Sequence, residues 1–322
     1  MADETPDISF KKQLPICIRY FNTTSYGIQE KFFRFIDVVD VSGENIARTI
    51  LQELDRLNLD ISYCRSQAYD GVSNLSGKFK GFQVCIAKVQ LLAIYSHCAN
   101  HRLNLAISKA CSVANIRNAI GVISSVSNFF RESAGRIHKL ETEVQDKLYL
   151  LKKGKHALKK MCRTRWVEKH DAVLTFLDTL PSPSVVLGTI SESFESRVRN
   201  VFSFLHAIQS SEFSFSVVVL AEVLGLTLPL ARKLQPEYMD VLEAMYLVEA
   251  TLESLREQHY KSTDTFKKIF KESEKLAMEM GTQINKPRIT NLQKNRSNFN
   301  SQTVEEYYRT AVNLPFMDLI IN

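Results

Sequence analysis

Asp70 stands where an acidic side chain could bind a metal ion or a phosphate group. Residues 60–69, which precede it, contain no Gly or Pro and predict a strand. Gly71, Ser73 and Asn74 then predict a tight turn. Ligands of open α/β sheets gather at the carboxyl ends of strands, and Mg²⁺ prefers carboxylate oxygens. The alternative is that Asp70 only caps the turn.

The strongest concentration of charge lies at residues 152–169. Eight of these eighteen positions are basic, and Glu168 is the only acid among them. The segment could follow a phosphate backbone or serve as a nuclear localisation signal, although such a run can also be the solvated face of a helix. The basic residues are Lys152, Lys153, Lys155, Lys159, Lys160, Arg163, Arg165 and Lys169.

Trp166 is the only tryptophan of the chain and directly follows Arg165. An arginine and a tryptophan side by side can stack on bases or flank a phosphate. A sole tryptophan can equally anchor a helical core, and the sequence leaves both interpretations open.

Cys98 and His101 form a Cys-x₂-His pair, next to His97. A structural zinc site needs four ligands, commonly in two separated pairs, and no second pair is apparent. Zinc is therefore disfavoured. The six cysteines show no paired spacing and no secretion signal precedes them, so reduced thiols are expected.

Composition is that of an ordinary globular protein. The chain has 322 residues, of which 45% are hydrophobic and 24% charged, so two domains are expected. No run of about 18 apolar residues is apparent, and no membrane span is expected. The net charge of +6 does not by itself indicate nucleic acid.

The pattern of apolar residues divides the chain at about residue 115. Before it, strands are predicted at residues 13–22, 28–41, 60–69 and 91–97, and helices at 42–58, 77–90 and 98–111. After it, helices are predicted at residues 116–130, 136–152, 166–180, 191–208, 216–234 and 236–260.

These patterns predict an α/β domain at residues 1–115, an α-helical domain at 116–280, a polar basic linker at 281–301 and the start of a truncated C-terminal segment at 302–322. That last segment should contain a short helix and a turn at Pro315. The helix at 236–260 should bury an apolar face made of Met239, Leu242, Met245, Tyr246, Leu252 and Leu255.

Four sequence blocks, in this order, resemble the hAT transposase superfamily. They are ADETPDIS at residues 2–9, QAYDGVSNLSG at 67–77, HCANHRLNL at 97–105 and RTRW at 163–166. The blocks are most similar to the branch that includes zinc-finger MYM-type proteins and similar transposon-derived repressors.

The resemblance implies a fold and a site. The fold is an RNase H-like mixed sheet interrupted by a large α-helical insertion. Asp3 matches the first acid and Asp70 the second acid of a site that holds two divalent ions, Mg²⁺ or Mn²⁺, for phosphoryl transfer on DNA. The resemblance further implies that Arg165 and Trp166 lie near the cleaved DNA end, and that Cys98 and His101 have a structural role near the acids.

The sequence departs from the family at the third acid. In the family this acid follows the insertion, in a block similar to Ser-Ala-x-x-Glu-Arg, and the 322 residues contain no such block. Glu305 and Glu306 precede two tyrosines and are expected on an exposed helix face. The C-terminal part is therefore predicted to be truncated.

Two functions from different classes follow. The first is a catalytically inactive, transposase-derived protein that binds DNA or a protein partner in the nucleus. The second is an active DNA transposase that uses Mg²⁺ or Mn²⁺. A non-functional fragment of an element is a third interpretation. No membrane and no small-molecule substrate are expected for any of them.

Overall fold

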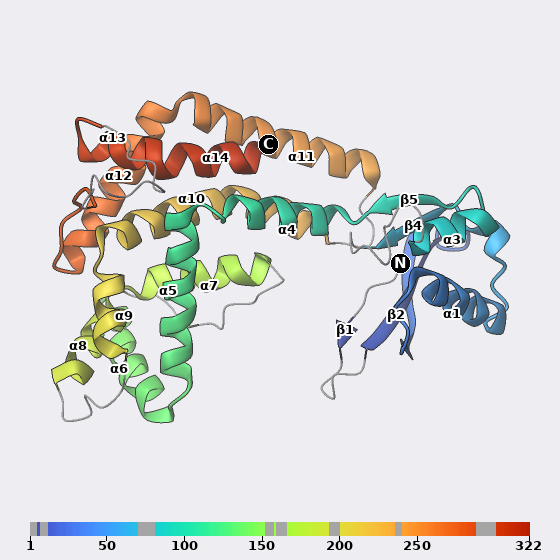
Figure 1. Cartoon of the computed structure of the whole chain (residues 1–322), viewed down its shortest axis with the longest axis horizontal. Helices are drawn as coiled ribbons and strands as arrows, with labels where there is room; N and C mark the ends of the chain where they lie inside the picture. The colour runs from blue at the N-terminus through green and yellow to red at the C-terminus, as the bar shows by residue number, and fades with distance from the viewer. Residues whose placement is uncertain are drawn as a thin grey trace. The chain divides into compact units, whose positions relative to one another are not determined.

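The computed structural model describes residues 5–6, 12–69, 81–151, 158, 166–192, 200–235, 240–287 and 301–322. The chain forms two compact units, whose helices and strands are labelled in Figure 1. The first unit comprises Met1–Leu103 with Leu234–Val241, and the second comprises Asn104–Lys233 with Leu242–Asn322.

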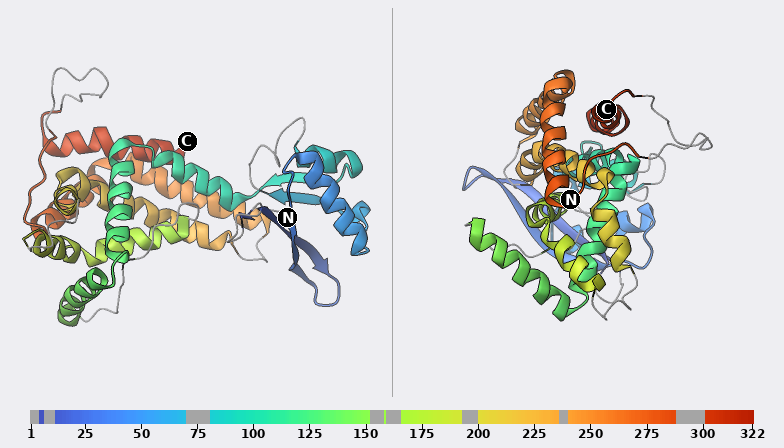
Figure 2. Two further views of the ribbon diagram at one scale, coloured as in Figure 1. Left: turned by 60° about the horizontal axis from the view of Figure 1, so that its bottom comes forward. Right: turned by 90° about the vertical axis from the view of Figure 1, so that its left-hand side faces the viewer.

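A three-stranded antiparallel sheet opens the first unit, in the order β1-β2-β3. Successive residues of a strand point to opposite faces, and Leu14 and Ile16 share the buried face of β2. β2 and β3 form the long hairpin drawn in blue in Figure 2. The strands are β1 (Thr5–Pro6), β2 (Lys12–Asn22) and β3 (Gly27–Asp37).

The expected strand at residues 13–22 is confirmed, whereas the strand predicted at 28–41 ends early, at Asp37. The reason lies in Asp40, whose carboxylate accepts hydrogen bonds from the backbone N–H and the hydroxyl of Ser42, both at 2.9 Å. Such side-chain bonds favour a turn over a strand ladder. Helix α1 (Gly43–Arg56) then begins as predicted, with the Ser42 hydroxyl accepting the Asn45 N–H at 3.4 Å.

A second, two-stranded sheet is parallel and is formed by β4 (Ser66–Tyr69) and β5 (Ile94–His97). The strand predicted at residues 60–69 is mostly wrong, because Asp60 accepts the N–H and the hydroxyl of Ser62 at 2.8 and 2.7 Å. These bonds start a 3₁₀ turn, η1 (Ile61–Tyr63), instead of a strand.

The strand predicted at residues 91–97 also begins late. The Gln90 side chain accepts the Leu92 N–H at 3.2 Å and so supports a turn before β5. Helix α3 (Phe82–Val89) precedes this turn, and α4 (Ala99–Ala110) follows β5 as predicted.

Helices α1 and α3 pack on each other, and their apolar residues join those on the buried face of the first sheet in one core. Its hydrophobic core consists of Leu14, Ile16, Val38, Ile46, Ala47, Ile50, Tyr69, Phe82, Ile86 and Ala93. The opposite face of the hairpin leaves Phe21, Phe32 and Phe35 about half exposed.

Every described element of the second unit is a helix. Helix α10 lies at its centre and packs against α5, α7 and α12, with residues 215–220 all buried. The helices are α5 (Ala114–Arg131), α6 (Ala134–Leu151), α7 (Trp166–Thr179), α8 (Ser182–Glu192), α9 (Val201–Ile208), α10 (Ser211–Lys233), α11 (Val241–Tyr260) and α12 (Ser262–Glu279). The assignment of this unit as an insertion, and the predicted domain boundaries, stay predictions.

Three helices of the second unit differ from what the sequence predicts. The single helix expected at residues 191–208 is wrong, because Asn200, directly before α9, has a left-handed backbone with a φ of 89°. Helix α8 begins at Ser182, and Pro183 in its first turn is tolerated because N–H groups there have no helical partner. Helix α12 lies where no element is predicted.

Helix α11 buries only the C-terminal part of the predicted face, where Leu252 is half-buried. Leu255 is buried, but Leu242, Met245 and Tyr246 are 67%, 56% and 71% exposed. No other element in the described part of the chain packs extensively against α11. Met239, also expected in that face, lies outside the described residues.

The C-terminal segment belongs to the core of the second unit. It consists of α13 (Val304–Tyr308), a π-helical turn η2 (Arg309–Asn313) and α14 (Leu314–Ile321). Pro315 lies in the first turn of α14, so the predicted turn at that residue is wrong. Tyr308 is fully buried, with its ring 4.6 Å from that of Phe215 and its hydroxyl donating to the Asn285 carbonyl at 3.0 Å.

Helix α10 is long and apolar enough to cross a membrane by length and composition, and the bent pair α7–α8 passes the same test if taken as one span. In α10, however, 67% of the relevant window is buried within the structure. That burial is what the central helix of a helical core shows, so the helix is weak evidence for a membrane span.

Candidate functional site at the ends of strands β4 and β5

The two parallel strands end side by side. Tyr69, the last residue of β4, lies opposite His97, the last residue of β5, and the Cys98 N–H donates to the Tyr69 carbonyl at 3.3 Å. Asp70 follows Tyr69 in sequence, so the predicted acid comes directly after a strand end. Asp70 and Asp3 themselves lie outside the described residues, and their shared metal site stays a prediction.

A buried glutamine holds the strand that leads to Asp70. The Gln67 side-chain amide donates to the carbonyl of Ala93 at 2.8 Å and to that of Gln83 at 3.2 Å. Its carbonyl oxygen accepts the Tyr69 hydroxyl. The amide therefore ties β4 to α3 and to the residue before β5. This role is not among the sequence predictions, although the period-two pattern places Gln67 and Tyr69 on one buried face, where a polar group needs partners.

A series of aromatic rings runs from the core to the strand ends. The Tyr69 ring lies 4.9 Å from Phe82 and 5.0 Å from Tyr95. The Tyr95 ring lies 6.3 Å from His97, which lies 5.5 Å from His101. Burial raises the pKa of Tyr69 far above its ordinary value, so its hydroxyl stays protonated and acts as a hydrogen-bond donor.

Cys98 and His101 join β5 to α4. The backbone of Cys98 donates to β4 and accepts the Arg102 N–H at 3.0 Å, so it begins the helix. Its thiol is exposed, while His101 is half-buried against His97. Among the residues that the structure describes, no three His, Cys, Asp or Glu side chains are grouped to hold a metal ion. The structural role of the pair stays a prediction.

The basic segment joins α6 to α7. Residue 158 is its one described position before α7: Leu158 is buried, and its carbonyl accepts a hydrogen bond from Arg131 at 3.4 Å. Trp166 begins α7, which leaves its two interpretations open. The predicted DNA-binding residues outside the described part of the chain are Lys152, Lys153, Lys155, Lys159, Lys160, Arg163 and Arg165.

A buried histidine lies one turn further along α7. His170 is 2% exposed, its Nδ1 is 3.7 Å from the Asp171 carboxylate, and Arg232 lies 3.4 Å from that carboxylate. Burial lowers the pKa of His170, and the nearby charge of Asp171 opposes this effect only in part. The imidazole is therefore kept neutral.

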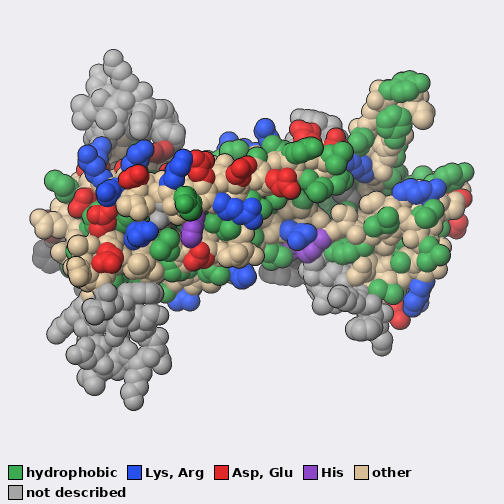
Figure 3. Space-filling model, turned by 90° about the horizontal axis from the view of Figure 1, so that it is seen from above, with side chains coloured by type: hydrophobic (Ala, Val, Ile, Leu, Met, Phe, Trp, Pro, Cys, Tyr) green, Lys and Arg blue, Asp and Glu red, His purple; other side chains and the backbone are tan. Residues whose placement is uncertain are grey.

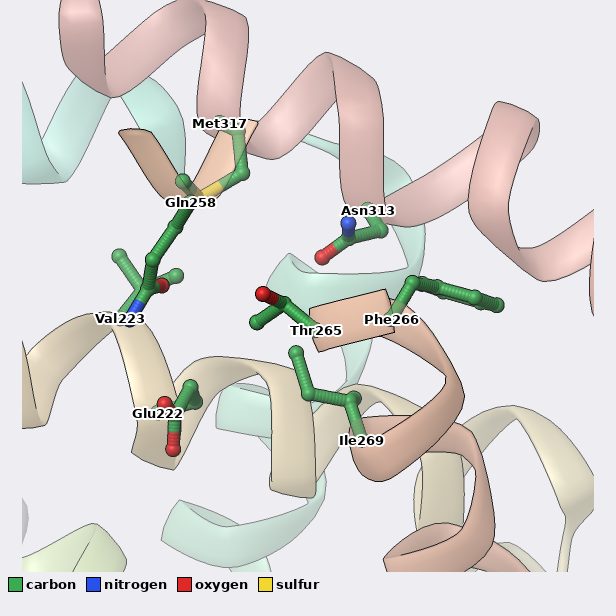
Figure 4. A pocket seen from close by; sticks show the side chains of 8 residues that line it. All are labelled: Glu222, Val223, Gln258, Thr265, Phe266, Ile269, Asn313 and Met317. Carbon is green, nitrogen blue, oxygen red and sulfur yellow. The ribbon is translucent and has the colours of Figure 1, made fainter. Parts of the chain in front are cut away.

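The second unit also contains a small surface hollow, shown in Figure 4. Thr265 and Asn313 point toward one another across it. It has room for about one water molecule, much less than a small-molecule site needs. Its lining residues are Glu222, Val223, Gln258, Thr265, Phe266, Ile269, Asn313 and Met317.

One family of known proteins matches the N-terminal part of the chain. A family model described as "ZMYM1/FAM200, RNase-like domain" matches residues 1–81, which include the first sheet, α1 and β4. This match is compatible with the RNase H-like fold inferred from the sequence blocks.

Two longer proteins are similar along the whole chain. The "52 kDa repressor of the inhibitor of the protein kinase" of Homo sapiens is 27% identical over 330 residues, and that of Mus musculus is 27% identical over 332 residues. Each alignment covers 100% of this chain and 43% of the relative, so the chain spans less than half the length of either protein. Together the matches support a transposase-derived family.

Proposed function

We propose that the chain derives from an hAT transposase and binds DNA in the nucleus without cutting it. The observation that carries the proposal is the similarity along the whole chain to a protein named as a repressor. The match of residues 1–81 to an RNase-like domain also supports it. The four hAT-like blocks add the finer placement, and three of them surround the predicted acids and the Arg-Trp pair.

DNA binding is assigned to the basic segment between α6 and α7. Lysines and arginines that neutralise phosphates release counterions, which supplies most sequence-independent affinity. The segment could also carry the nuclear localisation signal. Trp166, at the start of α7, is adjacent in sequence and offers a ring for stacking on a base.

Absence of cutting is inferred from the number of acidic ligands. Asp3 and Asp70 could bind one hard cation, Mg²⁺ or Mn²⁺, which would keep several of its waters. In-line phosphoryl transfer needs two clamped cations, and the 322 residues offer no third acid in a matching block. The alternative of an active transposase requires an acid from elsewhere to complete the site.

The test is the salt dependence of DNA binding by the full chain. We expect the logarithm of affinity for labelled duplexes to fall linearly with the logarithm of salt concentration, and similarly for unrelated sequences. Changing Lys152, Lys153, Lys159 and Lys160 to Ala should flatten the slope by roughly one unit for each phosphate that the variant no longer neutralises.

A matched control removes the same charge from elsewhere. Four exposed lysines of α12 (Lys267, Lys268, Lys271 and Lys275) are changed to Ala, and the slope should then stay as in the unchanged chain. Equal slopes for the two quadruple variants would place the DNA contacts outside the basic segment. If the chain does not bind DNA at low salt, the proposal that it binds DNA is refuted.

A further inference from the structure

Helix α11 exposes three large apolar side chains on one side. Leu242, Met245 and Tyr246 are each more than half exposed. Residues three and four apart lie on the same side of a helix, so the three form one continuous stripe. The side that packs inward carries Leu255, which is 2% exposed. These three side chains are therefore not part of the hydrophobic core of the second unit.

The same side of α11 continues as an acidic surface. Glu249 and Glu253 follow Leu242 by seven and eleven residues and are both exposed. Arg256, which is also exposed, follows Glu253 by three residues and ends the acidic stretch on this side. Figure 3 views the chain from above and shows acidic and basic side chains interspersed with apolar ones on that face. The exposed side thus has an apolar half and a negative half.

We propose that this surface binds a basic amphipathic helix of a partner protein. The surface consists of Leu242, Met245, Tyr246, Glu249 and Glu253, and is called the α11 stripe. Apolar residues of the partner would cover the first three side chains, and its lysines or arginines would meet the two glutamates. Met and Tyr are enriched in protein interfaces, and helical ligands commonly dock through residues at such spacings.

The charge of the stripe selects among occupants. Negative carboxylates repel the phosphates of DNA, and the same glutamates of a second α11 offer Glu249 and Glu253 no complementary charge. A basic helix has the complementary charge. The proposal goes beyond the proposed function and uses none of the DNA-binding residues, so the two can fail separately.

The probe is a synthetic peptide of eighteen residues, roughly five helical turns. It carries Leu at the spacing i, i+3, i+4 and i+7 along its whole length, so that all leucines share one side of the helix, and Lys at most other positions. One matched peptide has Glu in place of every Lys, and a second has the same composition with the Leu positions scrambled. We expect the full 322-residue chain to bind the basic amphipathic peptide at least about tenfold more tightly than either control peptide.

Two variants of the stripe separate its apolar and its charged half. Met245→Ser with Tyr246→Ser should weaken peptide binding about tenfold or more, because both large apolar side chains are removed from the surface. Glu249→Gln with Glu253→Gln should weaken it several-fold and reduce its salt dependence. All four side chains are exposed, so both variants should keep the unfolding temperature of the parent chain.

Matched control variants come from exposed positions on other helices. Phe202→Ser in α9 removes an equally exposed apolar side chain, and Glu272→Gln with Glu274→Gln in α12 removes the same charge. Neither should change peptide binding. Equal binding of the three peptides, or equal effects of stripe and control variants, would overturn the proposal. Competition by duplex DNA, or self-association lost with the Met245 and Tyr246 substitutions, would do the same by identifying another occupant.

Discussion

The side chain of Gln67 makes three hydrogen bonds that stabilise β4, and we predict the free energy lost when they are removed. Changing Gln67 to Leu keeps a side chain of similar size but removes all three bonds. At about 1 kcal/mol of net stability for each bond, the loss is about 3 kcal/mol. The Tyr69 hydroxyl also stays buried without its acceptor, which adds about 1–3 kcal/mol. We therefore expect Gln67→Leu to destabilise the first unit by roughly 4–6 kcal/mol.

A second substitution tests whether the network acts as one unit. Tyr69→Phe alone removes one bond and leaves the Gln67 oxygen short of a donor. In the double variant the buried hydroxyl is gone, so part of the penalty of Gln67→Leu disappears. The cost of the double variant should be smaller than the sum of the single costs by about 1–2 kcal/mol.

The assay must report on the first unit alone, because a chain of two units need not unfold in one step. Hydrogen exchange of the full chain, followed in peptides that cover β4 and β5, meets this need. Gln52→Leu, at an exposed position of α1, is the matched control and should leave the exchange unchanged. Unchanged exchange in Gln67→Leu, or strictly additive single costs, would refute the role given to this network.

Two further predictions concern catalysis and pH. The purified chain should not nick or join labelled duplexes with candidate element ends at any Mg²⁺ or Mn²⁺ concentration; nicking that disappears in Asp70→Ala would contradict this and point to an acid such as Glu305. The free energy of unfolding should fall as the pH drops below about 6.5, since His170 has a lowered pKa and the unfolded chain takes up that proton first. In urea titrations followed by Trp166 fluorescence, His170→Gln should reduce this pH dependence and the exposed His206→Gln should not; equal pH dependence in all three proteins would count against the buried neutral imidazole.

Elements with strong local signals could be predicted from the sequence. Helix α1 has Ser42 as its cap and regularly spaced isoleucines, and it begins where the sequence places it. The central strand β2 and the helical character of the chain after residue 114 were equally clear, although α8, α9 and α12 were not placed correctly. In these segments the local preference and the tertiary packing agree, which is why a pattern of apolar residues was sufficient.

The errors have a common physical cause. At Asp40, Asp60 and Gln90, polar side chains bond to nearby backbone groups and end or delay strands that the apolar pattern extends. In α11, Leu242 and Met245 have the spacing of a buried face, but few neighbours lie against them. Spacing shows which residues share a side of a helix, and only the tertiary structure decides which side is covered.

The candidate site was only partly predictable. The sequence places Asp70 after the end of a strand. The structure adds that this strand, β4, pairs in parallel with β5, so that Tyr69 and His97 end the two strands side by side. The role of Gln67 depends on acceptors sixteen and twenty-six residues away, which no local pattern reveals. Asp3, Asp70 and the basic segment stay predictions, since they lie outside the described residues.

The burial of the C-terminal segment has a consequence for how the protein folds during synthesis. Tyr308, Phe316 and Ile320 complete a core whose centre, Phe215, is made about a hundred residues earlier. While the ribosome is still extending the chain, α10 and α12 present their apolar sides without these partners. The second unit can reach its final packing only after α14 has left the ribosome, whereas the first unit can assemble long before. Nascent chains of this protein should thus depend on chaperones mainly through the exposed surface of α10.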